Sequence, residues 1–222
     1  ITNDDVGPQE GKLGFWIVAR QHAAEVTSSW VVDGLVDFLL SNDPQARALR
    51  AHAEFNIVPM INPDGVVAGN YRVVEEIDQW VAEGNSYDYF GDVHSTSGAN
   101  PHFAFYAAES VEPSLYEEPS EYHEDSFAFL ETMNEINPDF DHLKGESTSL
   151  NTGLGRQHQM EEYGVLAFTF EAGYVRVYQG PDSDEFMTPT RHREVGVAMA
   201  KALLDYFDVP VKVSMTNGIL CE

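Results

Sequence analysis

The stretch that decides the fold class is residues 13–25, which read LGFWIVA over Leu13–Ala19 and then RQHAAE. An uninterrupted apolar run of this length predicts a buried β-strand, and the polar residues after it mark the end of that strand. Residues 25–40 then carry Val26, Trp30, Val31, Leu35 and Phe38 at helical spacing, so they predict an amphipathic helix. A buried strand that leads directly into a helix is the opening of an α/β unit.

The rest of the chain repeats this alternation. We predict further strands at 54–60, 87–93, 102–107 and 165–170, and further helices at 73–82, 126–136 and 190–207. Two acidic segments, at about 109–125 and 179–184, are predicted to be surface loops. We find neither an internal repeat nor a linker in the sequence. The pattern therefore predicts an α/β layer protein with a largely parallel or mixed sheet.

Composition narrows the class of protein. The 222 residues are 43% apolar, which is enough for a full core. No apolar run approaches the length of a membrane span, and the single cysteine, Cys221, leaves no disulfide and no cysteine-based zinc site. Because the chain opens at Ile1 rather than with Met, we expect a processed product or a fragment.

Charge is the unusual quantity. Thirty-seven acids against twelve bases give a net charge of −25, which disfavours nucleic acid and anionic membranes as partners. Only four of the twelve bases are lysines. This balance favours adaptation to high salt, where screening cancels the repulsion between carboxylates, over an ordinary acidic protein.

Chemically active residues follow the predicted strands. In open α/β sheets, sites form beyond the carboxyl ends of the strands. Four such ends deliver two histidines, two glutamates and one arginine, which are His22, Glu25, Arg72, His94 and Glu171. Imidazoles and one carboxylate can hold Zn²⁺ with a position open for water, and a further carboxylate can accept the proton of that water. The convergence predicts a metallohydrolase.

Taken singly, these residues have other interpretations. A second His-x-x-Glu pair, His158 and Glu161, falls in a polar stretch that predicts a solvated helix surface. His94 alone is equally compatible with a buried, hydrogen-bonded histidine, and Arg72 alone with an ordinary surface arginine. Glu171 closes an apolar strand, where a carboxylate is costly unless it is paired or functional.

Together the motifs resemble a known family. His22-x-x-Glu25, Asn62-Pro63-Asp64-Gly65, Gly69-Asn70-Tyr71-Arg72, Asp92-Val93-His94-Ser95 and Phe168-Thr169-Phe170-Glu171 are similar to motifs of the zinc carboxypeptidases of the pancreatic carboxypeptidase A type. They occur in the family's order over about residues 13–208. The stretch 59–66, with Gly69–Arg72 after it, is most similar to the cytosolic carboxypeptidase, deglutamylase-like branch.

The resemblance implies a site and a reaction. One Zn²⁺ per chain would be held by His22, Glu25 and His94. Glu171 would serve as general base and then as acid, and Arg72 would polarise the scissile carbonyl and stabilise the oxyanion. The implied substrate is the C-terminus of a peptide or protein, and the implied location is the cytoplasm.

The resemblance also implies a fold. It is a single α/β/α catalytic domain over residues 1–222, with three layers and a mixed, mostly parallel, twisted sheet. The family further implies a cis peptide bond between Ser95 and Thr96.

The chain departs from the family after Arg72. The Asn-Arg pair that grips the substrate carboxylate is absent there, and residues 73–76 read VVEE. We predict that a segment of several dozen residues, containing this pair, is missing between Arg72 and Val73; the alternative is a shortened enzyme, in which Arg156 could replace the pair. Two other functions stay open, a zinc-dependent deacylase of N-acyl amino acids and an inactive metal-binding or interaction protein.

Overall fold

The computed structural model describes residues 1–3, 11–62, 68–96, 100–107, 119–147, 155–174 and 186–211. Six strands form one sheet in the order β2-β1-β3-β6-β4-β5. Their bounds are Leu13–Ala19 for β1, Ala53–Val58 for β2, Tyr89–Ser95 for β3, Phe103–Ala107 for β4, Glu146–Ser147 for β5 and Leu166–Ala172 for β6. Strands β2, β1, β3 and β6 are parallel, whereas β4 runs antiparallel to β6. The predicted mixed, mostly parallel sheet is confirmed.

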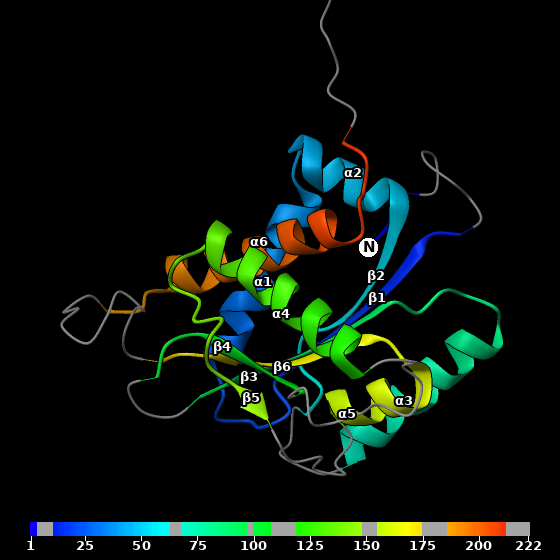
Figure 1. The fold of residues 1–222 in the computed structure, drawn as a ribbon, viewed down its shortest axis with the longest axis horizontal. Coiled ribbons are helices and arrows are strands. Elements are labelled where there is room, and N and C mark those ends of the chain that lie inside the picture. Colours follow the sequence, from blue (N-terminus) through cyan, green and yellow to red (C-terminus); the bar gives the residue numbers. More distant parts are fainter. Residues whose placement is uncertain are drawn as a thin grey trace, which may run out of the picture.

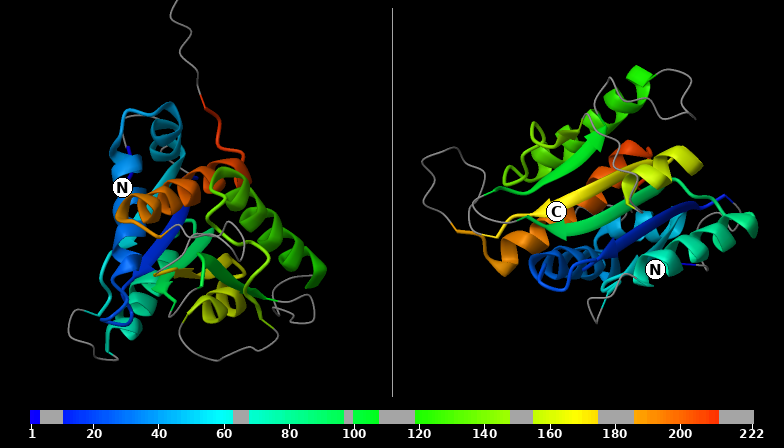
Figure 2. Two further views of the ribbon diagram at one scale, coloured as in Figure 1. Left: turned by 90° about the vertical axis from the view of Figure 1, so that its left-hand side faces the viewer. Right: turned by 90° about the horizontal axis from the view of Figure 1, so that it is seen from below.

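Helices cover both faces of this sheet (Figure 1). Their bounds are Thr27–Leu40 for α1, Pro44–His52 for α2, Ala68–Ala82 for α3, Pro119–Ile136 for α4, Arg156–Tyr163 for α5 and Pro189–Tyr206 for α6. Helices α1, α4 and α6 lie on one face, and α3 and α5 lie on the other (Figures 1 and 2). The predicted three-layer α/β/α arrangement is confirmed.

Strand β1 shows how the sequence builds the two layers. Because side chains alternate along a strand, its apolar residues divide between two cores. Phe15 and Ile17 belong to the core under α1 and α6, while Trp16 and Val18 belong to the core under α3 and α5. A strand buried on both faces must be apolar throughout, which is why this stretch decided the fold class.

Helices α1 and α6 cross at two glycines. A Cβ on Gly34 would lie 2.2 Å from the Arg193 carbonyl oxygen, and a Cβ on Gly196 would lie 2.0 Å from the Val31 carbonyl oxygen. Only a residue without a side chain allows backbones to come so close. This contact fixes α1, whose first turn follows the first two candidate ligands.

Several predicted boundaries are wrong. The helix predicted at 73–82 begins at Ala68, and the one predicted at 126–136 begins at Pro119, so residues 119–125 are helical rather than loop. Residues 109–118 and 179–184 lie outside the described residues. On α1, Trp30 is 40% exposed rather than buried, and Val26, just before the helix, is 48% exposed.

Two further expectations concern single bonds. The described backbone contains no cis peptide bond, so the cis bond expected between Ser95 and Thr96 is wrong. The bond between Arg72 and Val73 lies inside α3, because this helix starts before Arg72. Within the described part of the chain, no helix is both long and apolar enough to cross a membrane.

Candidate metal centre

Three neighbouring parallel strands bring the candidate residues together. Strands β1, β3 and β6 are adjacent in the sheet, so their carboxyl ends lie at one edge. His94 on β3 is the register partner of Glu171 on β6. His22 and Glu25 lie in the segment between β1 and α1. The sheet order, which the sequence does not show, therefore makes one site of these four residues.

His22, Glu25 and His94 form a compact cluster. The carboxylate of Glu25 lies between the two rings, with Oε1 at 2.8 Å from His22 Nδ1 and Oε2 at 2.9 Å from His94 Nδ1. One ligand atom from each residue lies within 4.8 Å of the others, and among the described residues this is the one group of its kind. Ligand atoms this close together are compatible with one shared zinc ion, which binds nitrogen and oxygen ligands at about 2 Å.

The donor atoms also fit a cation chemically. Glu25 Oε2 is buried and has no hydrogen-bond donor, although His94 Nδ1 is only 2.9 Å away. The contact thus lacks the alignment of a hydrogen bond. A buried carboxylate oxygen without a donor is costly, and a shared cation would satisfy it together with both imidazole nitrogens.

The cluster is closed on one side and open on the other. The side chain of His94 is 9% exposed and that of Glu25 is 16% exposed, whereas that of His22 is 64% exposed. A metal held here would rest on a buried floor and meet solvent beside His22. A half-open arrangement is what a catalytic metal site requires, because such a site keeps one position open, whereas a structural site is closed.

Asp92 is a residue of the candidate site that the sequence analysis did not select. It is buried, and its Oδ2 lies 2.9 Å from His94 Nε2. When the His94 imidazole is neutral, as a metal ligand must be, a carboxylate that accepts the Nε2 proton leaves the Nδ1 lone pair for the metal, which is how metal-binding histidines are usually oriented. The signal was available, because residues two apart on a strand point to the same face.

The pKa of His94 is shifted strongly by its neighbours. Burial alone would lower the pKa of its imidazole, but the carboxylates of Asp92 and Glu25 raise this pKa to about 10. Burial raises the pKa of Glu25, yet the two histidines more than offset it, so the pKa is lowered overall. The carboxyl groups of Glu25, Asp92 and Glu171 outnumber the two imidazoles, and this excess of acidic groups favours a bound cation.

Glu171 has the properties of a general base. Burial is the largest cause that raises the pKa of its carboxyl, and the carboxylates of Glu25 and Asp92 add to it against His94, giving a pKa of about 7. A carboxyl with a pKa near the working pH can take up a proton and release it again. A cation in the cluster would lower this pKa.

The chain after Glu171 is held by two side chains. The Gly173 N–H donates to His102 Nδ1 at 3.1 Å, and the Tyr174 hydroxyl donates to the Ala24 carbonyl at 2.6 Å. A Cβ on Gly173 would lie 2.5 Å from the Asn100 carbonyl oxygen, so this position requires glycine. Both bonds fix the end of β6 against the rest of the site.

The loop that carries His22 and Glu25 is also held by side chains. Arg20 has a φ of 60°, which is uncommon for a residue other than glycine and turns the chain sharply after β1. Its guanidinium donates to the Ala23 carbonyl at 2.6 Å and to Ser29 Oγ at 3.1 Å. The Asn62 amide donates to the Gln21 carbonyl at 3.0 Å. The ligand-bearing loop is thus ordered by the protein itself.

The two candidate substrate arginines are not joined to the cluster. Arg72 is exposed on α3, and the described residues provide no contact between it and the three candidate ligands. Arg156 begins α5, and burial lowers the pKa of its guanidinium. Its neighbour Gly155 lies near the site, because a Cβ there would be 3.7 Å from Asp92 Oδ2. His158 and Glu161 lie on α5, outside the cluster.

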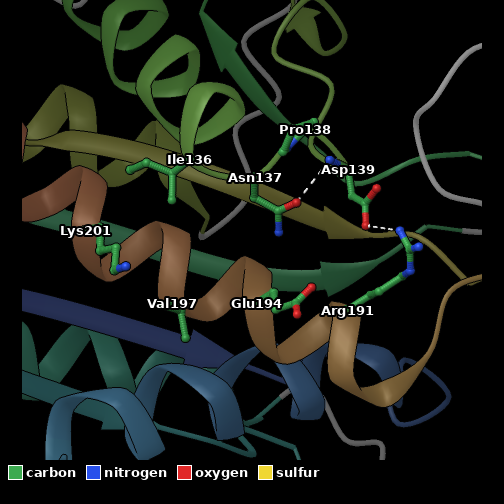
Figure 3. A pocket seen from close by; sticks show the side chains of 8 residues that line it. All are labelled: Ile136, Asn137, Pro138, Asp139, Arg191, Glu194, Val197 and Lys201. Carbon is green, nitrogen blue, oxygen red and sulfur yellow. Dashed lines mark hydrogen bonds and ion pairs between the residues drawn. The ribbon is translucent and has the colours of Figure 1, made fainter. Parts of the chain in front are cut away.

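A cavity of about 390 Å³ lies elsewhere, between the end of α4 and one face of α6 (Figure 3). An ion pair of 2.7 Å between Arg191 Nη1 and Asp139 Oδ2 lies at one end of it. Its lining residues are Ile136, Asn137, Pro138, Asp139, Arg191, Glu194, Val197 and Lys201. None of the candidate site residues is among them, so ligand chemistry and not cavity size locates the candidate centre.

Comparison with known proteins agrees with this chemistry. A family profile described as zinc carboxypeptidase matches residues 1–129. Cytosolic carboxypeptidase 2 of Mus musculus is 49% identical over 74 residues, which are 32% of this chain and 9% of that protein. Cytosolic carboxypeptidase 6 of the same organism is 52% identical over 61 residues, which are 28% of this chain and 11% of that protein. These matches cover only a small part of the longer relatives.

A solved structure extends the likeness to most of the fold. The metallo-carboxypeptidase from Burkholderia cenocepacia superposes with a TM-score of 0.72 at 27% sequence identity. The match covers 94% of this chain and 59% of that one. The resemblance drawn from the motifs is confirmed in both sequence and fold.

Proposed function

This chain belongs to the zinc carboxypeptidase family, whose profile matches more than half of it, and we propose that it is a zinc-dependent metallocarboxypeptidase. One observation carries the proposal: a His-Glu-His cluster, open to solvent beside His22, faces the register partner of His94, which is Glu171. The names of the relatives support peptide or protein C-termini as substrates and a cytoplasmic location.

The proposed metal ligands are His22, Glu25 and His94, which would hold one Zn²⁺ per chain. Zinc bound there supplies Lewis acidity that lowers the pKa of water and polarises a carbonyl. Asp92 keeps the His94 imidazole in the tautomer whose Nδ1 faces the cluster. The excess of acidic groups around the two histidines supports the binding of a divalent cation.

Glu171 would move the proton. Its carboxylate would accept a proton from the attacking water and give the same proton to the nitrogen of the leaving amine as the peptide bond breaks. Burial raises the pKa of Glu171 to about 7 in the metal-free protein, and the same burial opposes the fall that a bound cation would cause, which supports both halves of this exchange. We propose Arg72 as the group that stabilises the oxyanion, and Arg156 as a group that binds the substrate's terminal carboxylate.

We also propose that the natural polypeptide has several dozen further residues between Arg72 and Val73, with the family's Asn-Arg pair among them. The lack of that pair after Arg72 supports this proposal. So does the solved relative, of which this chain covers 59%. Peptide mapping of the natural protein with a glutamate-specific protease tests this directly, because residues absent here, with an Asn-Arg pair among them, should follow Arg72. A peptide in which Arg72 is joined directly to Val73 would establish the shortened enzyme instead.

The test of function compares three substrates. Peptides with a free C-terminus should be cleaved, whereas the same peptides with an amidated C-terminus and N-acyl amino acids should not. Glu171→Gln should retain zinc and lose turnover by about two to four orders of magnitude, because the amide cannot take up the proton. Full activity in Glu171→Gln would remove the general-base assignment.

The alternatives give different results in the same assays. Hydrolysis of N-acyl amino acids without cleavage of peptides would identify a deacylase. Stoichiometric zinc without either activity would identify a metal-binding or interaction protein.

A further inference from the structure

The three segments that carry the candidate site meet at two buried hydroxyl groups. Thr27 follows Glu25 by two residues, Ser95 follows His94 directly, and Ala172 follows Glu171 directly. Thr27 and Ser95 are each 7% exposed, and Ala172 is 2% exposed. We call Thr27 and Ser95 the hydroxyl pair. It lies next to all three segments without being part of the proposed ligand set.

The hydroxyl pair is hydrogen-bonded to each segment. Thr27 Oγ1 lies 2.7 Å from Ser95 Oγ and 3.2 Å from the Ala172 carbonyl oxygen. The Ser28 N–H donates to Ser95 Oγ at 3.0 Å. Each hydroxyl rotates and has one proton, so every contact is satisfied when Ser95 donates to Thr27 and Thr27 donates to Ala172.

Strand pairing does not account for these bonds. Ser95 and Ala172 are already register partners in the sheet, and the Thr96 N–H donates to the Ala172 carbonyl at 3.1 Å. What the hydroxyl pair adds is a connection from the first turn of α1 to the ends of β3 and β6. The segment with Glu25 is thereby tied to the strands with His94 and Glu171.

Helix α1 depends on this connection at its start. Its N-cap position is Val26, which cannot accept a hydrogen bond through its side chain. The first backbone N–H groups of a helix lack partners within the helix and need a cap. Ser95 Oγ, from β3, supplies the acceptor for the Ser28 N–H. A residue next to one proposed ligand therefore caps the helix that follows another.

We infer that Thr27 and Ser95 are positioning residues, which hold the Glu25 carboxylate and the His94 imidazole in place relative to the Glu171 carboxylate. This inference rests on the proposed function. Neither hydroxyl touches the cluster, so both act through the backbone of their neighbours. Small displacements of reacting groups reduce turnover strongly, and loss of supporting hydrogen bonds around a metal site lowers affinity or activity by about 10–100-fold.

The test uses two substitutions at one position. Thr27→Val keeps the shape of the side chain and removes the hydroxyl, while Thr27→Ser keeps the hydroxyl. Thr27→Val should lower kcat about tenfold or more with KM little changed, and should weaken zinc binding in a chelator competition. The visible spectrum of the Co²⁺-substituted protein should shift in Thr27→Val. Thr27→Ser should keep the kcat, the zinc affinity and the Co²⁺ spectrum of the wild type.

Tyr122→Phe is the matched control. The Tyr122 hydroxyl is buried and donates to the Ala167 carbonyl of β6 at 3.1 Å, five residues before Ala172. The same hydroxyl accepts the Ala167 N–H at 3.2 Å, so the substitution removes two buried hydrogen bonds to β6 away from its carboxyl end. It should lower the urea midpoint without changing kcat, zinc affinity or the Co²⁺ spectrum. If Thr27→Val does not fold, Ser95→Ala replaces it and should show the same losses.

The outcomes separate the two proposals. Wild-type kcat, zinc affinity and Co²⁺ spectrum in Thr27→Val would overturn the positioning role and leave the proposed function intact. Losses of equal size in Thr27→Ser and Thr27→Val would also overturn it, because shape and not the hydroxyl would be responsible. A wild-type protein that binds zinc but cleaves no peptide contradicts the proposed function, and zinc affinity and the Co²⁺ spectrum then decide the inference. A wild-type protein that binds no zinc overturns both.

Discussion

Two pairs of histidines have the same spacing and opposite chemistry. The rings of His22 and His94 have centroids 5.0 Å apart, and so do the rings of His102 and His192. In the first pair, carboxylates raise the pKa of His94 to about 10. In the second pair, burial lowers the pKa of His102 to about 3 and that of His192 to about 4.

The difference lies in the neighbours and not in the histidines. Glu25 and Asp92 both contact His94, whereas His102 Nδ1 accepts a backbone N–H from Gly173. His102 is 1% exposed and His192 is 3% exposed, so both remain neutral in the core. Proximity of two imidazoles is therefore no sign of a metal site. Carboxylates beside them are what make such a pair attractive to a cation.

The largest expected effect is on bound zinc. His94→Ala should abolish stoichiometric zinc, because it removes one of three ligands. His192→Ala should keep it, although both substitutions remove a buried imidazole. Elemental analysis of the two gel-filtered variants measures this directly. Full zinc in His94→Ala would show that the ligand set is wrong.

The second largest expected effect is on zinc affinity, and it tests the carboxylate of Asp92 rather than a histidine. Asp92→Asn keeps the shape of the side chain but removes the charge beside His94, so zinc affinity should fall by about 10–100-fold. Asp139→Asn is the control, since Asp139 is also buried but is paired with Arg191 away from the cluster. Chelator competition gives both dissociation constants. Equal affinities in the two variants would remove Asp92 from the site.

The buried histidine pair, His102 and His192, should make the fold less stable at low pH. A histidine takes up a proton near pH 6.5 when unfolded, but His102 has a pKa of about 3 in the fold. Its contribution is therefore fully present above about pH 6.5 and is lost as the pH falls toward 3, at about 1.4 kcal/mol per pH unit. Urea unfolding of the metal-free protein at several pH values below 6.5 measures this slope. The free energy of unfolding of His102→Asn should depend less steeply on pH than that of the wild type, by about that amount.

His94 should show the opposite behaviour in the metal-free protein. Its pKa in the fold is raised to about 10, so its contribution is present below about pH 6.5 and is lost as the pH rises toward 10. The His102 prediction has its own contradicting outcome. If the free energy of unfolding changes with low pH equally in the wild type and in His102→Asn, the buried histidines are not neutral in the fold.

The smallest expected effect is the salt dependence of the melting temperature, which depends on the overall acidic charge and not on either histidine pair. With a net charge of −25, carboxylate repulsion should destabilise the fold at low salt. Molar KCl shortens the screening length to about 3 Å, so the melting temperature should rise with salt. The buried pair should keep its pH slope, because salt does not enter the core. A melting temperature that is flat or falls would leave the acidity without this explanation.

Most of the candidate site followed from strand ends that the sequence marks clearly. His22, Glu25, His94 and Glu171 each follow or close an apolar run, and apolar runs identify buried strands without knowledge of their order. Asp92 was missed because it lies within such a run and not at its end, although its position two residues before His94 puts both side chains on one face of β3. The roles of Arg72 and Arg156 remain predictions, since neither side chain contacts the cluster in the described part of the chain.

Helix boundaries were predicted less well for a different reason. The start of α4 lies among polar residues, and α3 starts at Ala68 just before Gly69 and Asn70, which are typical of turns, so periodicity gives no signal at either place. Trp30 has helical spacing with buried residues but lies at the edge of the apolar face, where the Arg193 guanidinium covers its ring at 5.3 Å. Burial at the edge of a face depends on the neighbouring element, and in this chain that element is α6.

The sequence by itself determined the α/β class, the strands of the parallel sheet and the residues at their ends, because these depend on the local pattern of apolar and polar side chains. Only the tertiary structure decided that β1, β3 and β6 are neighbours, that His94 is the register partner of Glu171, and that the hydroxyls of Thr27 and Ser95 join three distant segments. Contacts between residues far apart in the chain depend on strand order and register, which are properties of the whole packed core.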